Sequence, residues 1–259
     1  MRSLLSSSKN RNFLRSHLDS RTLLAFDFDG TLAPIANDPY RARLRASTAR
    51  LLSELCGVAP VAVISGRGVR DLKEKVPSSI QLLSGNHGLE APGVRSRTLR
   101  RMAQVSSKWK QQLLKQMKQV EFDTTGILVE DKEFSLSIHY RSAKQRTKVK
   151  AALLAMVGHL NPKPRIVLGK FIVNVVAPES PHKGDALLSI MKKVKAKRAV
   201  YVGDDDNDED VFVLKNPRLL TVRVGARNSS KAKYYIKNQR SIDELLGLMI
   251  QSLKKSSVD

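Results

Sequence analysis

The sequence predicts an α/β fold in which a doubly wound, mostly parallel sheet is interrupted by an inserted, smaller α/β domain. Two observations support this prediction. Short apolar runs alternate with helical segments at both ends of the chain. Between them, residues 96–179 combine helical stretches with strands whose apolar and polar residues alternate, which is typical of antiparallel sheets.

The core strands are predicted from mostly apolar runs of four or more residues, which indicate burial on both faces of a parallel sheet. These runs lie at 22–26, 61–64, 80–83, 199–203 and 219–225. Helices are expected at 47–55, 182–194 and 241–255, with Ser47 as the expected N-cap of the first. Residues 1–95 and 180–259 are therefore assigned to one core domain.

The inserted domain is assigned to residues 96–179. Its helices are expected at 102–120 and 144–159. Its strands are expected at 126–130, 134–140, 165–169 and 171–176, the last two forming a hairpin. Pro178 and Pro181 mark the return of the chain to the core domain.

The first 20 residues allow two interpretations. The segment is rich in Ser and Arg and poor in acidic residues, as transit peptides are. Its apolar residues, however, suit a short amphipathic helix packed on the core: Leu4, Leu5, Phe13, Leu14 and Leu18. We favour the helix. No apolar run approaches the roughly 20 residues that a membrane-spanning helix needs.

The formal net charge of +22 has three interpretations. Basic residues bind nucleic-acid phosphates, steer anionic small substrates, or simply form a solvated surface. They are spread along the chain, and the aromatic residues that would stack on bases make up only 5%. We therefore favour a solvated surface and expect no nucleic-acid or membrane partner. A basic nucleic-acid-binding protein remains the alternative from another functional class.

The single cysteine, Cys56, excludes an internal disulfide framework and fits a reducing compartment. Its neighbours are those of a residue packed in a core, so no catalytic role is expected for this thiol. The prediction is a cytoplasmic, monomeric protein.

Two acidic clusters follow predicted strands. Asp27 and Asp29 come directly after one strand, and the run 204–210 follows another. Ligands of open α/β sheets bind at the carboxyl ends of the strands. Carboxylates brought together there repel one another unless a cation lies between them, and a hard divalent cation prefers oxygen ligands. The sequence therefore predicts a Mg²⁺ site.

Phosphate-binding groups accompany these acids. Ser65 offers a hydroxyl donor, Gly66 lets the backbone approach closely, and Lys183 can neutralise developing charge. Each signal is weak alone, because an isolated lysine is usually a surface residue.

The segment 27-DFDGT-31 resembles the signature of the haloacid dehalogenase (HAD) phosphatase superfamily. Ser65, Lys183 and the run from Gly203 to Asp208 resemble its other motifs, in order and after the expected strands. Longer segments are similar to trehalose-6-phosphate phosphatases: 27-DFDGTLAPI-35, 63-VISGR-67, 85-GNHGLE-90 and 203-GDDDNDEDVF-212. The resemblance covers about residues 21–255 and implies a HAD-like core with an α/β cap domain that sets substrate specificity.

The resemblance implies a two-step hydrolysis of a phosphosugar, in which Asp27 forms an aspartyl-phosphate and Asp29 is the general acid and base. Ser65 and Lys183 would hold the phosphate oxygens, with Arg67 assisting. The implied Mg²⁺ ligands are Asp27, the backbone carbonyl of Asp29, and Asp204, supported by Asp205 or Asp208. The implied sugar-binding residues are His87 and Glu90 from the core and Lys132, His139 and Arg141 from the cap.

One position departs from the family pattern. Asn174 stands on a cap strand where the family usually has a glutamate. An asparagine can hydrogen-bond a hydroxyl group but brings no charge. The expected substrate is trehalose 6-phosphate, and another phosphosugar, such as mannosyl- or glucosyl-3-phosphoglycerate, is the alternative.

Overall fold

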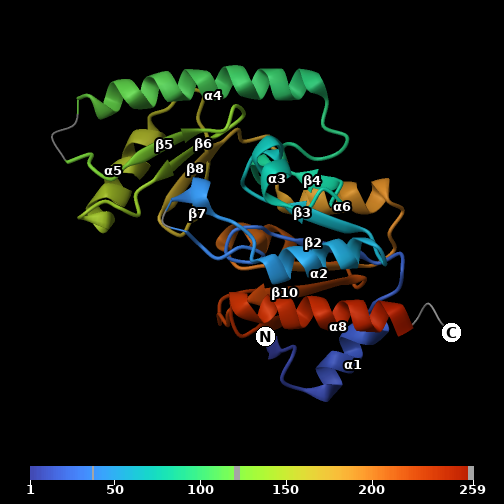
Figure 1. Ribbon diagram of the computed structural model, residues 1–259. Coiled ribbons are helices and arrows are strands. Elements are labelled where there is room, and N and C mark those ends of the chain that lie inside the picture. The colour runs from blue at the N-terminus through green and yellow to red at the C-terminus, as the bar shows by residue number, and fades with distance from the viewer. Residues whose placement is uncertain (37, 120–122, 256–259) are drawn as a thin grey trace. The chain divides into compact units, whose positions relative to one another are not determined.

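The computed structural model describes residues 1–36, 38–119 and 123–255, and the chain divides into two compact units (Figure 1). The first unit combines Met1–Pro92 with His182–Asp259, and the second is Gly93–Pro181. In the described ranges, no helix has both the length and the hydrophobicity needed to cross a membrane.

In its described part, the first unit contains a seven-stranded sheet in the order β1-β11-β10-β9-β2-β3-β4, and its strand pairs are parallel. The strands are β1 (Arg2–Ser3), β2 (Leu23–Phe26), β3 (Val61–Ile64), β4 (Leu82–Ser84), β9 (Ala199–Gly203), β10 (Leu219–Val224) and β11 (Tyr234–Ile236). From β2 the chain moves to β3 and β4 on one side and later to β9, β10 and β11 on the other. The strand order therefore reverses between β2 and β9, which is the place where doubly wound sheets bind ligands.

Alternate residues of the central strands pack into two different apolar layers, because successive side chains of a strand point to opposite faces. On β2, Leu24 and Phe26 belong to one buried cluster, and Leu23 and Ala25 belong to the other. Both faces of the strand are buried, which is why its sequence is continuously apolar.

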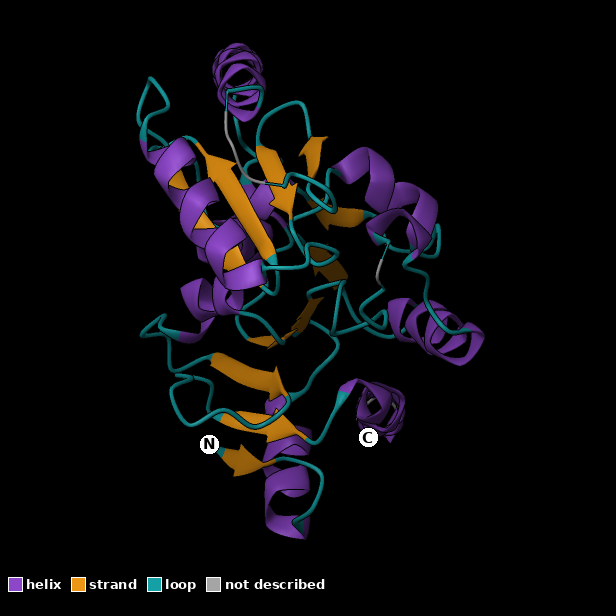
Figure 2. Ribbon diagram, turned by 90° about the vertical axis from the view of Figure 1, so that its left-hand side faces the viewer, coloured by secondary structure: helices purple, strands orange, loops and turns teal. Residues whose placement is uncertain are grey.

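Helices cover both faces of this sheet. The first layer is formed by α1 (Ser8–His17), α2 (Ala46–Cys56) and α8 (Ile242–Lys255). Figures 1 and 2 show α2 and α8 side by side. The second layer contains α6 (Lys183–Lys193) and the short α7 (Glu209–Phe212). α3 (Val69–Lys75) follows β3 in the chain and contributes Leu72 to the first layer. Full burial of each leucine side chain contributes about 1.5–3 kcal/mol.

The described part of the second unit consists of an antiparallel sheet and two helices. Its described strands have the order β5-β6-β8-β7. They are β5 (Leu128–Asp131), β6 (Leu136–His139), β7 (Arg165–Gly169) and β8 (Ile172–Val176), and the helices are α4 (Ser96–Met117) and α5 (Arg146–Gly158). β7 and β8 form the predicted hairpin. Trp109 of α4 is fully buried and donates its indole hydrogen to the Pro162 carbonyl at 2.6 Å.

The N-terminal segment differs in part from the expected helix. β1 adds a short parallel strand at the sheet edge, near the N label in Figure 2, and α1 begins only at Ser8. Leu4, Leu14 and Leu18 are buried in the core, as expected for a segment packed on the domain. Phe13 stays half-exposed and stacks on Tyr234 of β11, so it covers the strand from outside.

Several boundaries were predicted wrongly. Arg45, not Ser47, is the N-cap of α2, and the Ser47 hydroxyl donates instead to Asp243 of α8 at 2.7 Å. β4 lies two residues later than its expected start, and α4 begins at Ser96; the expected helix end at residue 120 lies outside the described residues. The elements β11, α3 and α7 were not predicted, because they are short and their apolar periodicity is correspondingly weak.

Candidate active site

The loop after β2 places the first two acids. Asp27 donates its backbone N–H to the Val202 carbonyl of β9 at 2.9 Å, which holds it at the end of both strands. Gly30 has a φ of +82°, which permits the sharp turn that follows Asp29. Thr31 then donates its hydroxyl to Asp204 Oδ1 at 3.1 Å. Two segments far apart in the sequence are thereby joined.

Asp27, Asp204 and Asp208 form one cluster. Each offers a carboxylate oxygen, and these atoms lie within 4.8 Å of one another. Gly30 leaves room for this arrangement, since a Cβ on Gly30 would overlap the Asp204 carboxylate. A set of hard oxygen donors without sulfur or imidazole suits Mg²⁺. The chemistry of these residues therefore fits the expected ion.

Asp208 differs from the other two members, because its carboxylate already accepts four hydrogen bonds. Oδ1 accepts from Lys183 at 2.7 Å and Tyr201 at 2.6 Å. Oδ2 accepts from the backbone N–H groups of Asp204 and Asp205 at 2.8 and 2.9 Å. These donors use the full acceptor capacity of a carboxylate. Asp208 is thus suited to shaping the loop, whereas Asp27 and Asp204 retain acceptor sites for a cation.

Lys183 is the central cation of the cluster. It is 1% exposed and lies at the first residue of α6, after His182, whose side chain caps the helix. Its Nζ is 2.9 Å from Asp27 Oδ1 and 2.7 Å from Asp208 Oδ1. Burial alone would lower the pKa of Lys183, but the charges of Asp208 and Asp27 outweigh burial and raise it. The lysine is therefore fixed in its charged form.

Burial controls the acids themselves. It raises the pKa of Asp27 to about 7, with the Lys183 charge opposing the shift and Asp208 adding to it. Burial also raises the pKa of Asp204 well above its usual range, and the Asp27 charge adds to this effect. Both carboxyl groups would ionise more readily if a further cation lay beside them.

The acidic run 204–210 is compensated by arginines that were not predicted. Arg223 of β10 is buried and donates to the backbone carbonyls of Asp204 and Asp205 and to Glu209 Oε1. Arg227 forms an ion pair with Asp206. Protein cations thus neutralise part of the charge that the sequence argument assigned to a metal. In the sequence, the presence of Arg223 inside the otherwise mostly apolar run 219–225 could have indicated such a contact.

Ser65 and Arg67 follow β3. Ser65 is buried, and its Oγ accepts a hydrogen bond from the Arg67 backbone N–H at 3.2 Å. The Arg67 guanidinium contacts Asp29 through two nitrogens, at 2.6 and 2.7 Å, and Asp71 through the third, at 2.7 Å. Arg67 was predicted to assist phosphate binding, but its guanidinium is directed at two carboxylates.

The segment 85–90 lies against these residues. Glu90 Oε2 accepts from the Val69 backbone N–H at 3.0 Å and from Asn86 Nδ2 at 2.6 Å. His87 is buried with a φ of 59°, and its ring occupies the space that a Cβ on Gly66 would need. Glu90 therefore holds the start of α3, and His87 packs on the loop after β3.

The three expected sugar-binding residues of the second unit lie on or next to its sheet. Glu130, which was not predicted, is 2.8 Å from His139 Nε2 and 3.7 Å from Lys132 Nζ. The structure thus brings Lys132 and His139 together around one carboxylate. The Arg141 guanidinium lies over the Phe171 ring.

Asn174 is 2% exposed and its amide is used inside the same sheet. Its Oδ1 accepts from Ser137 of β6 at 2.6 Å, and its Nδ2 donates to the Val167 carbonyl of β7 at 3.0 Å. The side chain therefore links three strands.

Comparison of the sequence with known proteins gives one family. The sequence model described as trehalose-phosphatase matches residues 25–240. Trehalose-phosphate phosphatases of Mycobacterium ulcerans and Mycobacterium marinum are 29% and 30% identical to the chain over 212 and 213 residues, covering 79% of it and 54% of each relative. The chain spans about half the length of these relatives. The solved C. albicans trehalose-6-phosphate phosphatase C-terminal domain has a TM-score of 0.76 and 22% identity, covering 97% of this chain and 99% of that one. That likeness concerns the fold.

Proposed function

This chain belongs to the trehalose-phosphatase family, and on that premise we propose that it is a Mg²⁺-dependent phosphatase that converts trehalose 6-phosphate to trehalose and phosphate. One observation supports the proposal above the others. Asp27 lies in a buried cluster with the cation Lys183 and the second acid Asp204. A nucleophilic carboxylate needs this combination, because a phosphate dianion repels it unless positive charge is close.

In the proposed reaction, an Asp27 oxygen attacks phosphorus and the sugar oxygen leaves, so that an aspartyl-phosphate forms. Asp29 gives a proton to the leaving sugar oxygen and then takes one from the water that hydrolyses the aspartyl-phosphate. Lys183 and Ser65 hold phosphate oxygens. The proton that Asp29 gives to the sugar oxygen is thus restored from the attacking water, so Asp29 begins each turnover protonated.

Mg²⁺ would be held by the carboxylates of Asp27 and Asp204 and by the backbone carbonyl of Asp29, with Asp205 and Asp208 supporting the loop. When bound, the ion supplies positive charge that offsets repulsion between nucleophile and phosphate. The protein's own contribution is to keep these oxygens close together, through Thr31 on one side and Arg223 on the other.

We propose that the second unit acts as the cap domain and recognises the sugar through Lys132, His139 and Arg141, with His87 and Glu90 contributing from the first unit. The internal hydrogen bonds of Asn174 support a structural role for this side chain. Other phosphosugars remain the alternative substrates. A cytoplasmic, monomeric protein without a nucleic-acid partner also stays a prediction.

The test is a phosphate-release assay with Mg²⁺ on trehalose 6-phosphate, glucose 6-phosphate and the two phosphoglycerate glycosides. We expect kcat/KM to be highest for trehalose 6-phosphate, and a tenfold preference corresponds to about 1.4 kcal/mol of transition-state discrimination. Asp27→Asn, which keeps the shape of the side chain, is the control and should fold but release no phosphate. Mg²⁺-dependent turnover by this variant would disprove the nucleophile assignment.

A further inference from the structure

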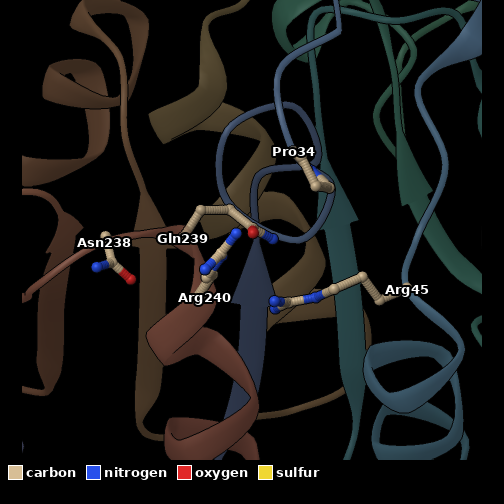
Figure 3. Close-up of a pocket in the computed structure, with 5 residues that line it drawn as sticks. All are labelled: Pro34, Arg45, Asn238, Gln239 and Arg240. Atoms are coloured by element: carbon tan, nitrogen blue, oxygen red, sulfur yellow. The ribbon is translucent and has the colours of Figure 1, made fainter.

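A pocket in the first unit is separate from the acidic cluster. It lies between the loop after β2, the start of α2 and the segment that leads into α8 (Figure 3). Its lining residues are Pro34, Arg45, Asn238, Gln239 and Arg240. None of these described lining residues is an acid, and two are arginines. The expected catalytic residues do not line it.

The two arginines approach the pocket from different elements. Figure 3 shows the Arg45 side chain, from the start of α2, extending toward Gln239 and Arg240. In the described part of the chain, Arg240 is exposed and its guanidinium has no hydrogen bond or ion pair. Two guanidinium groups that share a pocket repel each other, and an anion between them would remove this repulsion.

Arg45 already contacts one carboxylate, that of Asp243. Asp243 Oδ1 accepts from Arg45 NH2 at 3.3 Å and from the Thr48 hydroxyl at 2.6 Å, and Oδ2 accepts from Ser47 at 2.7 Å. Across the described ranges, Arg45 Nε is buried and makes no hydrogen bond. Because Nε is inaccessible, the donor hydrogens that Arg45 can offer to a ligand are those of its terminal nitrogens, of which NH2 contacts Asp243.

The pocket wall is held in place by hydrogen bonds to the loop after β2. Gln239 Nε2 donates to the carbonyls of Leu32 and Thr31, at 2.8 and 3.3 Å. Asn238 accepts from the Ser241 backbone N–H at 3.3 Å and so caps the turn that opens α8. A binding site on such a fixed frame loses less entropy when a ligand is ordered there.

We propose that this pocket binds a phosphate-bearing small anion, with Arg45 and Arg240 providing the positive charge. Arg240 has no ion pair in the described part of the chain, and Arg45 shares its charge with Asp243, so the two guanidinium groups leave a net positive charge at the pocket. A phosphate group, whose charge is close to −2 near neutral pH, is attracted to such a site. The planar donor fork of arginine also matches phosphate oxygens. Free phosphate and a phosphate ester share this chemistry.

The test is a titration of the ¹⁵N-labelled full chain with inorganic phosphate in the presence of EDTA, followed by NMR at constant ionic strength. The backbone amides of Gln239 and Arg240 should shift along a saturating one-site curve. Arg240→Gln should weaken this binding about tenfold or more, because a charged hydrogen-bonding partner is lost. Arg50→Gln is the matched control, since Arg50 is an exposed residue of α2 outside the pocket.

A second titration with glucose 6-phosphate separates the two sources of the anion. Tighter binding than that of inorganic phosphate assigns an ester as the ligand, and weaker binding assigns free phosphate. Shifts that stay linear with concentration would overturn the proposal, as would equal affinity in the Arg240→Gln and Arg50→Gln variants. The readout is binding at named amides, so it does not depend on phosphatase activity.

Discussion

The Arg67 guanidinium forms two parallel hydrogen bonds with the Asp29 carboxylate, from Nε to Oδ2 at 2.6 Å and from NH2 to Oδ1 at 2.7 Å. Its remaining terminal nitrogen binds Asp71 at 2.7 Å, and the ring of Phe28 lies under the group. Bidentate pairs of this kind fix both the position and the orientation of a carboxylate. Arg67 can therefore act through Asp29, as a positioning residue.

From this contact we predict that Arg67→Lys lowers kcat about tenfold and changes KM little, because lysine keeps the charge but makes one bond where arginine makes two. Arg67→Met should lower kcat further, by about a hundredfold. Steady-state kinetics on the preferred phosphosugar provide the measurement. A rise in KM at constant kcat would instead assign Arg67 to phosphate binding.

A second prediction concerns Gly30, which lies against the Asp204 carboxylate. An alanine there adds a methyl group where the Asp204 carboxylate lies and places a side chain at a φ of +82°. We predict that Gly30→Ala raises the Mg²⁺ concentration needed for half-maximal activity at least tenfold. Gly247→Ala is the matched control, because nothing lies within 4 Å of the added Cβ. Equal Mg²⁺ dependence in both variants would contradict the prediction.

The sequence was sufficient to predict the strands that bring the acids together. The run 61–64 coincides with β3, and 199–203 coincides with β9, because both strands are buried on both faces and therefore continuously apolar. β2 lies between β9 and β3 in the sheet. Because the carboxyl ends of parallel strands meet at one sheet edge, Asp27 after β2 and Asp204 after β9 were expected to lie close together.

Side-chain partners could not be predicted in the same way. Arg223 contacts the acidic loop because β10 lies next to β9, and Arg67 is directed at Asp29 because β3 lies next to β2. Such pairings depend on register and rotamers, which a residue pattern does not contain. Glu130 was missed for the same reason, since its contact with His139 requires the β5–β6 register.

Lys183 gives a prediction for stability. Its removal leaves Asp27 and Asp208 without their common cation inside the protein. Breaking a buried ion pair in this way costs about 3–5 kcal/mol, so Lys183→Met should lower the free energy of unfolding in urea by that amount. Lys192→Met, an exposed position on the same helix, should change it by less than about 0.5 kcal/mol. Similar losses in both variants would rule out the ion-pair explanation.

The raised pKa of Asp27 makes the stability of the metal-free protein depend on pH. Because burial raises this pKa from 3.8 to about 7, the folded protein binds more protons than the unfolded chain between these values. The free energy of unfolding should therefore fall as pH rises from about 4 to about 7, by at most about 4 kcal/mol from this group.

Magnesium should reverse this loss, since it binds the ionised carboxylate and competes with protons. We predict that saturating Mg²⁺ raises Tm more at pH 8 than at pH 5, and that the difference shrinks in Asp27→Asn. Differential scanning calorimetry with and without EDTA measures both effects. Equal increments at the two pH values would mean that the ion does not bind the Asp27 carboxylate, because only a ligand that must lose a proton couples metal affinity to pH in this range.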